Sequence, residues 1–110
     1  MGNYVDTYAP KFREQLKQQS LEFQKQIEAK IADLRNDPYH NTELLKGQYK
    51  GRRKARLNDS DRLTFVICEE CRHEGFYKYF RCSDCNQTPD NMLVFASLIS
   101  EHDYKGKTRW

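Results

Sequence analysis

The residues of this 110-residue chain whose spacing most clearly suggests chemistry are its four cysteines. They form two C-x-x-C pairs separated by ten residues. Four thiolates in this arrangement suit tetrahedral Zn²⁺, and a site with four protein ligands leaves no position open for a substrate. The sequence therefore predicts a structural zinc site with the ligands Cys68, Cys71, Cys82 and Cys85. A disulfide pair, an iron–sulfur centre and thiols without a metal are the alternatives.

The zinc ligands are expected on a zinc-ribbon-like hairpin at residues 68–85. Gly75 suits a turn, and the aromatic run at residues 76–80 is typical of a strand. A C-x-x-C turn supplies two ligands, and the hairpin brings the second pair across to them. His73 lies two residues after Cys71, so it is either a replacement for one thiolate or an ordinary surface histidine.

The basic side chains are a second group of candidate functional residues. The chain has a net charge of +3, but residues 46–62 alone hold seven basic and two acidic residues, a net charge of +5. Such a concentration of positive charge indicates a polyanionic partner, of which RNA or DNA is the commonest. A basic loop that only improves solubility is the alternative. The candidate nucleic-acid-binding residues are Lys46, Lys50, Arg52 and Arg53.

The elements that must position these residues begin with a strand and two helices. Tyrosine or valine alternates with polar residues at 3–8, which favours a short strand. Apolar residues recur at helical spacing after Pro10, and proline suits the first turn of a helix. Ser20 can cap a second helix, so we predict helices at 10–18 and 20–35. One long helix is the alternative, because the glutamines between the two are weak helix breakers.

Strands dominate the rest of the predicted fold. After a loop at 39–47, a basic strand at 49–57 and a strand at 62–67 form a hairpin around the turn residues 58–61. The apolar run at 92–99 predicts a last strand in a central position of the sheet.

Together these elements predict an α+β domain, in which an N-terminal strand and two helices pack on a small antiparallel sheet. One such domain spans residues 1–110, and the cysteine hairpin at 68–85 is an insertion between two strands. The longest apolar stretch is about the length of one strand, so the sequence predicts no membrane span. The first residues lack the basic start and apolar run of a signal peptide, and we expect a cytoplasmic protein.

Several short stretches, taken in their order, resemble the RelE/ParE toxin superfamily. They are 44–47 (L-L-K-G) after 36–38 (N-D-P), 54–57 (K-A-R-L), 61–67 (D-R-L-T-F-V-I), and 93–96 (L-V-F-A) followed by His102 and Tyr104. The resemblance covers roughly residues 1–67 and 92–106. The cysteine segment is not part of the family's common core.

This resemblance implies the toxin of a type II toxin–antitoxin system that cleaves messenger RNA on the ribosome. In the family's chemistry a ribose 2′-hydroxyl attacks the adjacent phosphate without a metal, which leaves a 2′,3′-cyclic phosphate and a 5′-hydroxyl. The implied partners are mRNA on the ribosome and a cognate antitoxin protein. The implied catalytic residues are Lys54, Arg56, Arg62, His102 and Tyr104.

The residue types make physical sense of that chemistry. Lys54 and Arg56 are two apart in a strand and project together, and Arg62 on the neighbouring strand can add a bidentate contact to phosphate. Fixed cations stabilise the extra negative charge of a phosphorane transition state. His102 titrates near neutral pH and suits acid–base catalysis, and Tyr104 can stack on an unpaired base.

Other interpretations of the same residues are open at this point. Arg62 could pair with Asp59 or Asp61 in the hairpin, and His102 could be an ordinary surface residue. A ParE-like inhibitor of DNA gyrase would share the fold and lack the nuclease residues. An inactive homologue is also consistent with Phe65, which stands where the family often has tyrosine. A non-catalytic zinc-ribbon module that binds nucleic acid or protein is the alternative of a different class.

Overall fold

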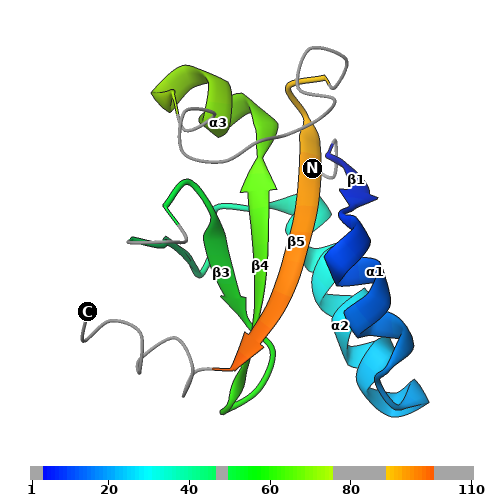
Figure 1. Cartoon of the computed structure of the whole chain (residues 1–110). Coiled ribbons are helices and arrows are strands. Elements are labelled where there is room, and N and C mark those ends of the chain that lie inside the picture. The colour runs from blue at the N-terminus through cyan, green and yellow to red at the C-terminus, as the bar shows by residue number, and fades with distance from the viewer. Residues whose placement is uncertain (1–3, 47–49, 76–88, 101–110) are drawn as a thin grey trace.

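The structure is a computed structural model that describes residues 4–46, 50–75 and 89–100 (Figure 1). Within these ranges the chain forms one five-stranded sheet and three helices. The elements in chain order are β1 (Val5–Tyr8), α1 (Pro10–Lys17), α2 (Leu21–Asn36), β2 (Thr42–Leu44), β3 (Arg53–Arg56), β4 (Asp61–Ile67), α3 (Cys68–Glu74) and β5 (Met92–Ser100).

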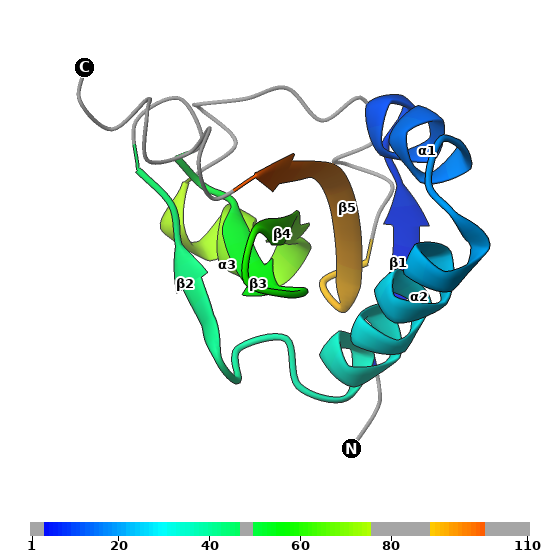
Figure 2. The ribbon, with the colours of Figure 1, turned by 90° about the horizontal axis from the view of Figure 1, so that it is seen from below.

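The strands lie in the order β1-β5-β4-β3-β2, so β5 has the central position that its apolar sequence predicts. The strands β2 to β5 pair antiparallel, whereas β1 pairs parallel with β5. Figure 2 shows α1 and α2 on one side of the sheet, next to β1 and β5. The predicted α+β architecture is confirmed. The sheet is mixed rather than purely antiparallel, because the first strand docks beside the last one in the same direction.

Two helices follow β1, as predicted, and the alternative of one long helix is wrong. Pro10 occupies the first turn of α1, where its missing N–H costs nothing. α1 ends at Lys17, and the Ser20 hydroxyl accepts a hydrogen bond from the Phe23 amide at 3.2 Å, which caps α2. In the described part of the chain, no helix combines the length and the apolar character that a membrane span requires.

The core lies between these helices and the sheet face that they cover. Phe12 of α1 is fully buried, and its ring centroid lies 5.2 Å from that of Tyr8 and 6.0 Å from that of Phe95. Phe65 packs on Phe95 at 5.7 Å, so aromatic rings connect α1 to three strands. The other buried residues of this core are Ile27, Ile31, Leu34, Ala55, Leu63, Ile67 and Leu93. Because side chains alternate across a strand, the neighbours of the buried strand residues project from the opposite face.

Two strand predictions need correction. The predicted loop at 39–47 contains β2, which pairs with β3 at the edge of the sheet. The predicted strand at 49–57 is shorter, because within the described residues β3 spans only Arg53–Arg56. A three-residue edge strand has no hydrophobic periodicity of its own, so its formation depends on the hydrogen bonds that β3 offers. The predicted β3–β4 hairpin is confirmed.

The first C-x-x-C pair lies in a helix, which corrects the prediction of a hairpin turn. α3 follows β4 directly, ends at Glu74 and is capped by Gly75, whose φ of 73° is the left-handed conformation that glycine adopts most readily. Cys68 and Cys71 are one helical turn apart and both buried. Burial of this face against the rest of the domain stabilises a helix too short to persist alone. The predicted strand at 76–80 lies outside the described residues.

Candidate nucleic-acid interface

Three of the predicted catalytic residues lie on one face of the β3–β4 hairpin. Arg56 is directly opposite Arg62, and Lys54 is opposite Thr64. Ala55, between Lys54 and Arg56, is buried in the core beneath the helices. Because side chains alternate, these cations occupy the face that points away from α1 and α2 (Figure 2). The structure therefore gathers three positive charges on the sheet face that those two helices do not cover.

The hairpin turn holds the guanidinium of Arg62 in place. Its Nη1 donates hydrogen bonds to the carbonyl oxygens of Asn58 at 2.7 Å and Asp61 at 3.0 Å. The side-chain oxygen of Asn58 in turn accepts hydrogen bonds from the backbone amides of Ser60 at 2.9 Å and Asp61 at 2.8 Å. These bonds fix the conformation of the turn. The carboxylate of Asp59 pairs with Arg56. The two carbonyl oxygens orient the Arg62 guanidinium, and an oriented guanidinium suits the binding of a phosphate.

Lys54 lies over a polar part of the same face. Its side chain is 15% exposed, and its Nζ is 3.8 Å from Oε2 of Glu43 on β2. Beside it, Oγ1 of Thr64 and Oγ of Ser97 are 2.8 Å apart and both residues are buried. The β4–β5 register shifts at this point and leaves Ala96 as the extra residue of a β-bulge, which turns Ser97 toward Thr64. Sequence reasoning missed this pair, whose only trace is a hydroxyl residue within each apolar strand.

The loop between β2 and β3 carries further basic candidates. Lys46 and Lys50 are exposed, and Arg52 is half-buried. The Leu45 amide donates a hydrogen bond to the Arg52 carbonyl at 2.8 Å, which closes the base of the loop. The loop therefore carries positive charge at the edge of the sheet that β2 and β3 form.

Arg53, the remaining candidate, is engaged inside the protein. Its Nε donates to Oε1 of Glu70 at 2.9 Å, and its Nη2 donates to Oε2 at 2.7 Å. The two side chains are only 14% and 11% exposed. The guanidinium also lies 4.9 Å from the centroid of the Tyr39 ring. Arg53 thus fastens β3 to α3, and its charge is directed to Glu70 rather than to the sheet face that carries Lys54.

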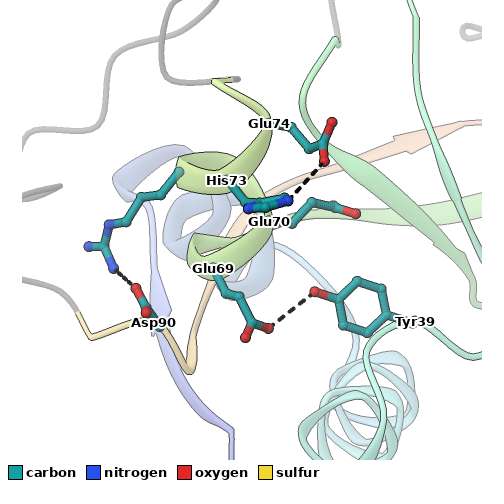
Figure 3. A pocket seen from close by; sticks show the side chains of 7 residues that line it. Tyr39, Glu69, Glu70, His73, Glu74 and Asp90 are labelled. Carbon is teal, nitrogen blue, oxygen red and sulfur yellow. Dashed lines mark hydrogen bonds and ion pairs between the residues drawn. The ribbon is translucent and has the colours of Figure 1, made fainter.

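An acidic pocket of about 710 Å³ opens beside α3 (Figure 3). Its lining residues are Tyr39, Glu69, Glu70, Arg72, His73, Glu74 and Asp90. The Glu69 carboxylate accepts hydrogen bonds from the Tyr39 hydroxyl at 3.3 Å and the Tyr4 hydroxyl at 3.5 Å. Burial, and then the charges of Glu69 and Glu70, raise the pKa of Tyr39 to about 12. Figure 1 shows α3 and the β3–β4 turn at opposite ends of β4, so negative and positive charge are separated along this strand.

The described residues contain only part of the predicted sites. His102 and Tyr104 lie outside them, as do the predicted zinc ligands Cys82 and Cys85. Among the described residues, no group of three or more His, Cys, Asp or Glu side chains is arranged to hold a metal ion. The structure therefore places three cations of the predicted catalytic site on one sheet face. Separately, it places the first cysteine pair on one face of α3.

Comparison with known proteins finds similar folds among solved structures. No family model and no curated protein matches the sequence. A chain of the RelBE2 toxin–antitoxin complex from Mycobacterium tuberculosis superposes with a TM-score of 0.59 at 15% identity, and the match covers 89% of this chain and 98% of that one. The YoeB/ParE toxin from Agrobacterium tumefaciens gives a TM-score of 0.60 at 11% identity, covering 87% and 96% of the two chains.

A third match is a chain of the YoeB–YefM complex from Staphylococcus aureus, with a TM-score of 0.56 at 19% identity and coverage of 88% and 95%. The chain has the RelE-like toxin fold. The RelE-like match spans nearly the whole of each of these three known chains. At such low identity a shared fold does not carry the activity with it, so function has to be argued from the residues.

Proposed function

We propose that this protein is the toxin of a type II toxin–antitoxin system and that it cleaves mRNA on the ribosome. The observation that carries the proposal is the position of Lys54, Arg56 and Arg62 on one sheet face of a RelE-like fold. Solved structures that share this fold are described as toxins or as toxin–antitoxin complexes. A fixed set of cations that can contact a phosphate is the feature that RNA cleavage through a charged phosphorane requires.

In the proposed reaction the 2′-oxygen of a ribose attacks the adjacent phosphorus, and the bond from phosphorus to the 5′-oxygen breaks. The proton of the 2′-hydroxyl passes to a base, and an acid delivers a proton to the departing 5′-oxygen. The products are a 2′,3′-cyclic phosphate and a 5′-hydroxyl. Lys54, Arg56 and Arg62 stabilise the charge on the phosphoryl oxygens. His102 is the proposed acid–base group, and Tyr104 is proposed to stack on an unpaired base.

The ion pairs on this face leave room for a phosphate to replace them. Glu43, the partner of Lys54, is 76% exposed at its side chain. In the other pair, Arg56 and Asp59 are 65% and 96% exposed. The Arg56–Asp59 pair is exposed on both sides and contributes at most about 1 kcal/mol, because water screens its two charges. A phosphate with charge-assisted hydrogen bonds competes with such a pair at little cost.

We further propose a cognate antitoxin as the protein partner. Two of the matched structures are complexes that contain an antitoxin component, RelBE2 and YoeB–YefM. The net charge of +5 over residues 46–62 favours an acidic or amphipathic antitoxin segment over the cationic face. Binding there would block RNA and keep the nuclease inactive.

The test of the nuclease is to map 5′ ends on an mRNA that is being translated by purified ribosomes in the presence of the purified protein. The variants are Arg62→Ala and His102→Ala, and Lys25→Ala is the control because this exposed lysine lies on α2. We expect new 5′ ends inside the reading frame with the wild type and with Lys25→Ala. Cleavage should fall by about 10²-fold or more in Arg62→Ala and by about 10²–10⁴-fold in His102→Ala.

Induced expression in a bacterial host separates this proposal from its alternatives. Growth arrest without new mRNA ends would contradict the nuclease and direct attention to another target such as DNA gyrase. A folded protein that causes neither arrest nor cleavage would contradict an active toxin of either kind.

A further inference from the structure

We propose that Arg53 is a positioning residue for RNA cleavage, a role that rests on the function proposed above, and that it sets the place of Lys54 by anchoring the edge of the sheet. Arg53 directly precedes Lys54 on β3, so the two side chains project from opposite faces. Sequence reasoning placed Arg53 among the residues that bind nucleic acid. Its contacts give it a different task, inside the protein.

The guanidinium of Arg53 connects β3 to two other elements. Its Nε and Nη2 bind the two carboxylate oxygens of Glu70 on α3, at 2.9 and 2.7 Å. Its Nη1 donates to the hydroxyl oxygen of Thr42 on β2 at 3.2 Å and to the carbonyl oxygen of the same residue at 3.4 Å. A planar guanidinium can bind these groups together because its N–H donors form a fixed fork, which the ammonium of lysine lacks.

The Thr42 hydroxyl extends this anchor to the turn before β2. It accepts from Arg53 and donates to the carbonyl oxygen of Pro38 at 2.8 Å, and Pro38 is buried. β2 has three residues and lies at the end of the strand order, beside β3. So short an edge strand depends on contacts with the rest of the domain. Arg53 supplies such contacts from the face that the helices cover.

The register of β2 and β3 places the proposed catalytic lysine directly over the anchor. Glu43 is opposite Lys54, and Nζ of Lys54 lies 3.8 Å from Oε2 of Glu43. Thr42 and Arg53 precede these two residues in the chain, so the anchor fixes the backbone from which Lys54 projects. A cation stabilises a phosphorane only where the charge develops. A displacement of about 1 Å can lower the rate of a reaction by about 10²-fold.

Direct binding of RNA by Arg53 is the competing explanation, and burial argues against it. The side chains of Arg53 and Glu70 are 14% and 11% exposed. An RNA phosphate would have to displace a mostly buried carboxylate from two hydrogen bonds, which leaves that carboxylate without its counter-charge. A pair that only stabilised the fold could be replaced by apolar side chains of similar volume. Apolar side chains would not connect β3 to α3 and β2 through directed bonds.

The first part of the test measures backbone amide hydrogen exchange by NMR in the purified full-length protein. The reporter is Leu45, whose amide donates to the Arg52 carbonyl at 2.8 Å, at the end of the β2–β3 pair. The reference is Ala9, whose amide donates to the Phe95 carbonyl at 2.9 Å, next to β1. The ratio of the two exchange rates reports opening of the β2 edge separately from unfolding of the whole domain. It requires neither RNA nor catalysis.

Two variants weaken the anchor, and a third serves as a control of similar stability. Arg53→Lys and Glu70→Gln should each raise the Leu45 to Ala9 exchange ratio by about tenfold or more, because hydrogen bonds to a charged partner are lost. Leu34→Ala removes a buried side chain of α2 and destabilises the whole domain. It should raise both exchange rates and leave their ratio unchanged.

The second part of the test measures cleavage of an mRNA on translating ribosomes, at a temperature where every variant is folded. Arg53→Lys keeps the positive charge and loses the fork. Its kcat should fall by about tenfold or more with KM unchanged, because a displaced Lys54 weakens an interaction made only in the transition state. Leu34→Ala should keep both constants.

The outcomes that would overturn the proposal are distinct. An exchange ratio in Arg53→Lys and Glu70→Gln equal to that of the wild type would show that Arg53 does not anchor β2. A raised KM with an unchanged kcat would show that Arg53 binds RNA directly. If neither variant folds, Thr42→Val removes one contact of the anchor, and an unchanged ratio in that variant would overturn the proposal.

Failure of the proposed function gives a different result. A folded wild-type protein that cleaves no mRNA would contradict the nuclease and, with it, the catalytic role of Lys54. The exchange ratio would still show whether Arg53 anchors the β2 edge, so the two failures are told apart.

Discussion

At the scale of single residues, neighbouring basic side chains of β3 have different surroundings because they alternate across the strand. Arg53 is held by Glu70 and covered by the Tyr39 ring, whereas Lys54 projects from the opposite face beside Thr64. The charge of Arg53 therefore stabilises the fold, whereas the charge of the next residue, Lys54, lies on the opposite sheet face. A count of basic residues cannot make this distinction.

The Arg53–Glu70 pair gives a first prediction. Glu70→Gln should lower the free energy of unfolding by about 3 kcal/mol, because it leaves a mostly buried guanidinium without its counter-charge. Urea denaturation measures this change. Glu74→Gln, on an exposed residue of the same helix, should change it by less than about 0.5 kcal/mol. Equal effects of the two variants would show that the pair does not stabilise the domain.

Tyr39 gives a prediction about alkaline pH. Its folded-state pKa is raised to about 12, whereas in the unfolded chain it is near 10.0. As pH rises through this interval the unfolded chain loses the phenolic proton first, so folding becomes less favourable. The contribution is fully present below about pH 10 and lost as pH rises through the folded pKa.

Tyr39→Phe should therefore show a shallower loss of stability than the wild type over about pH 10–12. Urea denaturation at several pH values in this range measures the slope. The difference should be modest, because Tyr39 is 39% exposed and water screens its charge. Identical slopes for the two proteins would contradict the assignment.

At the scale of elements, local signals determine where the helices begin, and contacts between distant segments determine the short elements. Pro10 and Ser20 act through their own backbone geometry and capping. By contrast, β2 depends on its pairing with β3, and α3 depends on burial of two cysteines and on contacts with residues far away in sequence. The elements that sequence reasoning missed are those without a local signal.

The cap of α2 gives a prediction at this scale. Ser20→Ala should lower the free energy of unfolding by about 1 kcal/mol, because the Phe23 amide loses its acceptor. Ser20→Asp should restore most of this loss. Thermal or urea denaturation measures both, with Gln26→Ala at an exposed position of the same helix as the control. A Ser20→Ala protein as stable as the control would show that the cap is not needed.

At the scale of the whole molecule, the aromatic core on one side of the sheet places the candidate cations on the other side. Phe12, Phe65 and Phe95 join α1 to β4 and β5, and the parity of these strands then sends Arg62 and Thr64 to the opposite face. The bulge at Ala96 is necessary for this arrangement, because it keeps both Phe95 and Leu98 in the core and places Ser97 beside Thr64. The core and the candidate site are therefore two sides of the same sheet.

Phe12 is the residue that tests this organisation. Phe12→Ala should lower the free energy of unfolding by about 3–5 kcal/mol, because it removes a fully buried ring between α1 and the sheet. Leu21→Ala is the control, since Leu21 is 75% exposed and should cost less than about 0.5 kcal/mol. Denaturant unfolding measures both. A loss below about 1 kcal/mol for Phe12→Ala would mean that α1 does not hold the sheet as the packing indicates.

The sequence by itself determined the α+β class, both long helices with their starting residues, the β3–β4 hairpin and the central apolar strand. These features follow from periodicity, proline, caps and turn residues, which act between neighbours in the chain. It also predicted that Lys54, Arg56 and Arg62 project together, because strand alternation and one hairpin turn are enough to place them on a common face.

Only the tertiary structure decided that β1 lies parallel to β5, that Arg53 is bound to Glu70, and that Cys68 and Cys71 share a buried helix face. It also decided the buried Thr64–Ser97 pair and the bulge that creates it. Each of these features depends on groups that are many residues apart and meet only in the folded chain. Their stabilising free energy comes from desolvation and pairing at those contacts, which a local sequence pattern does not encode.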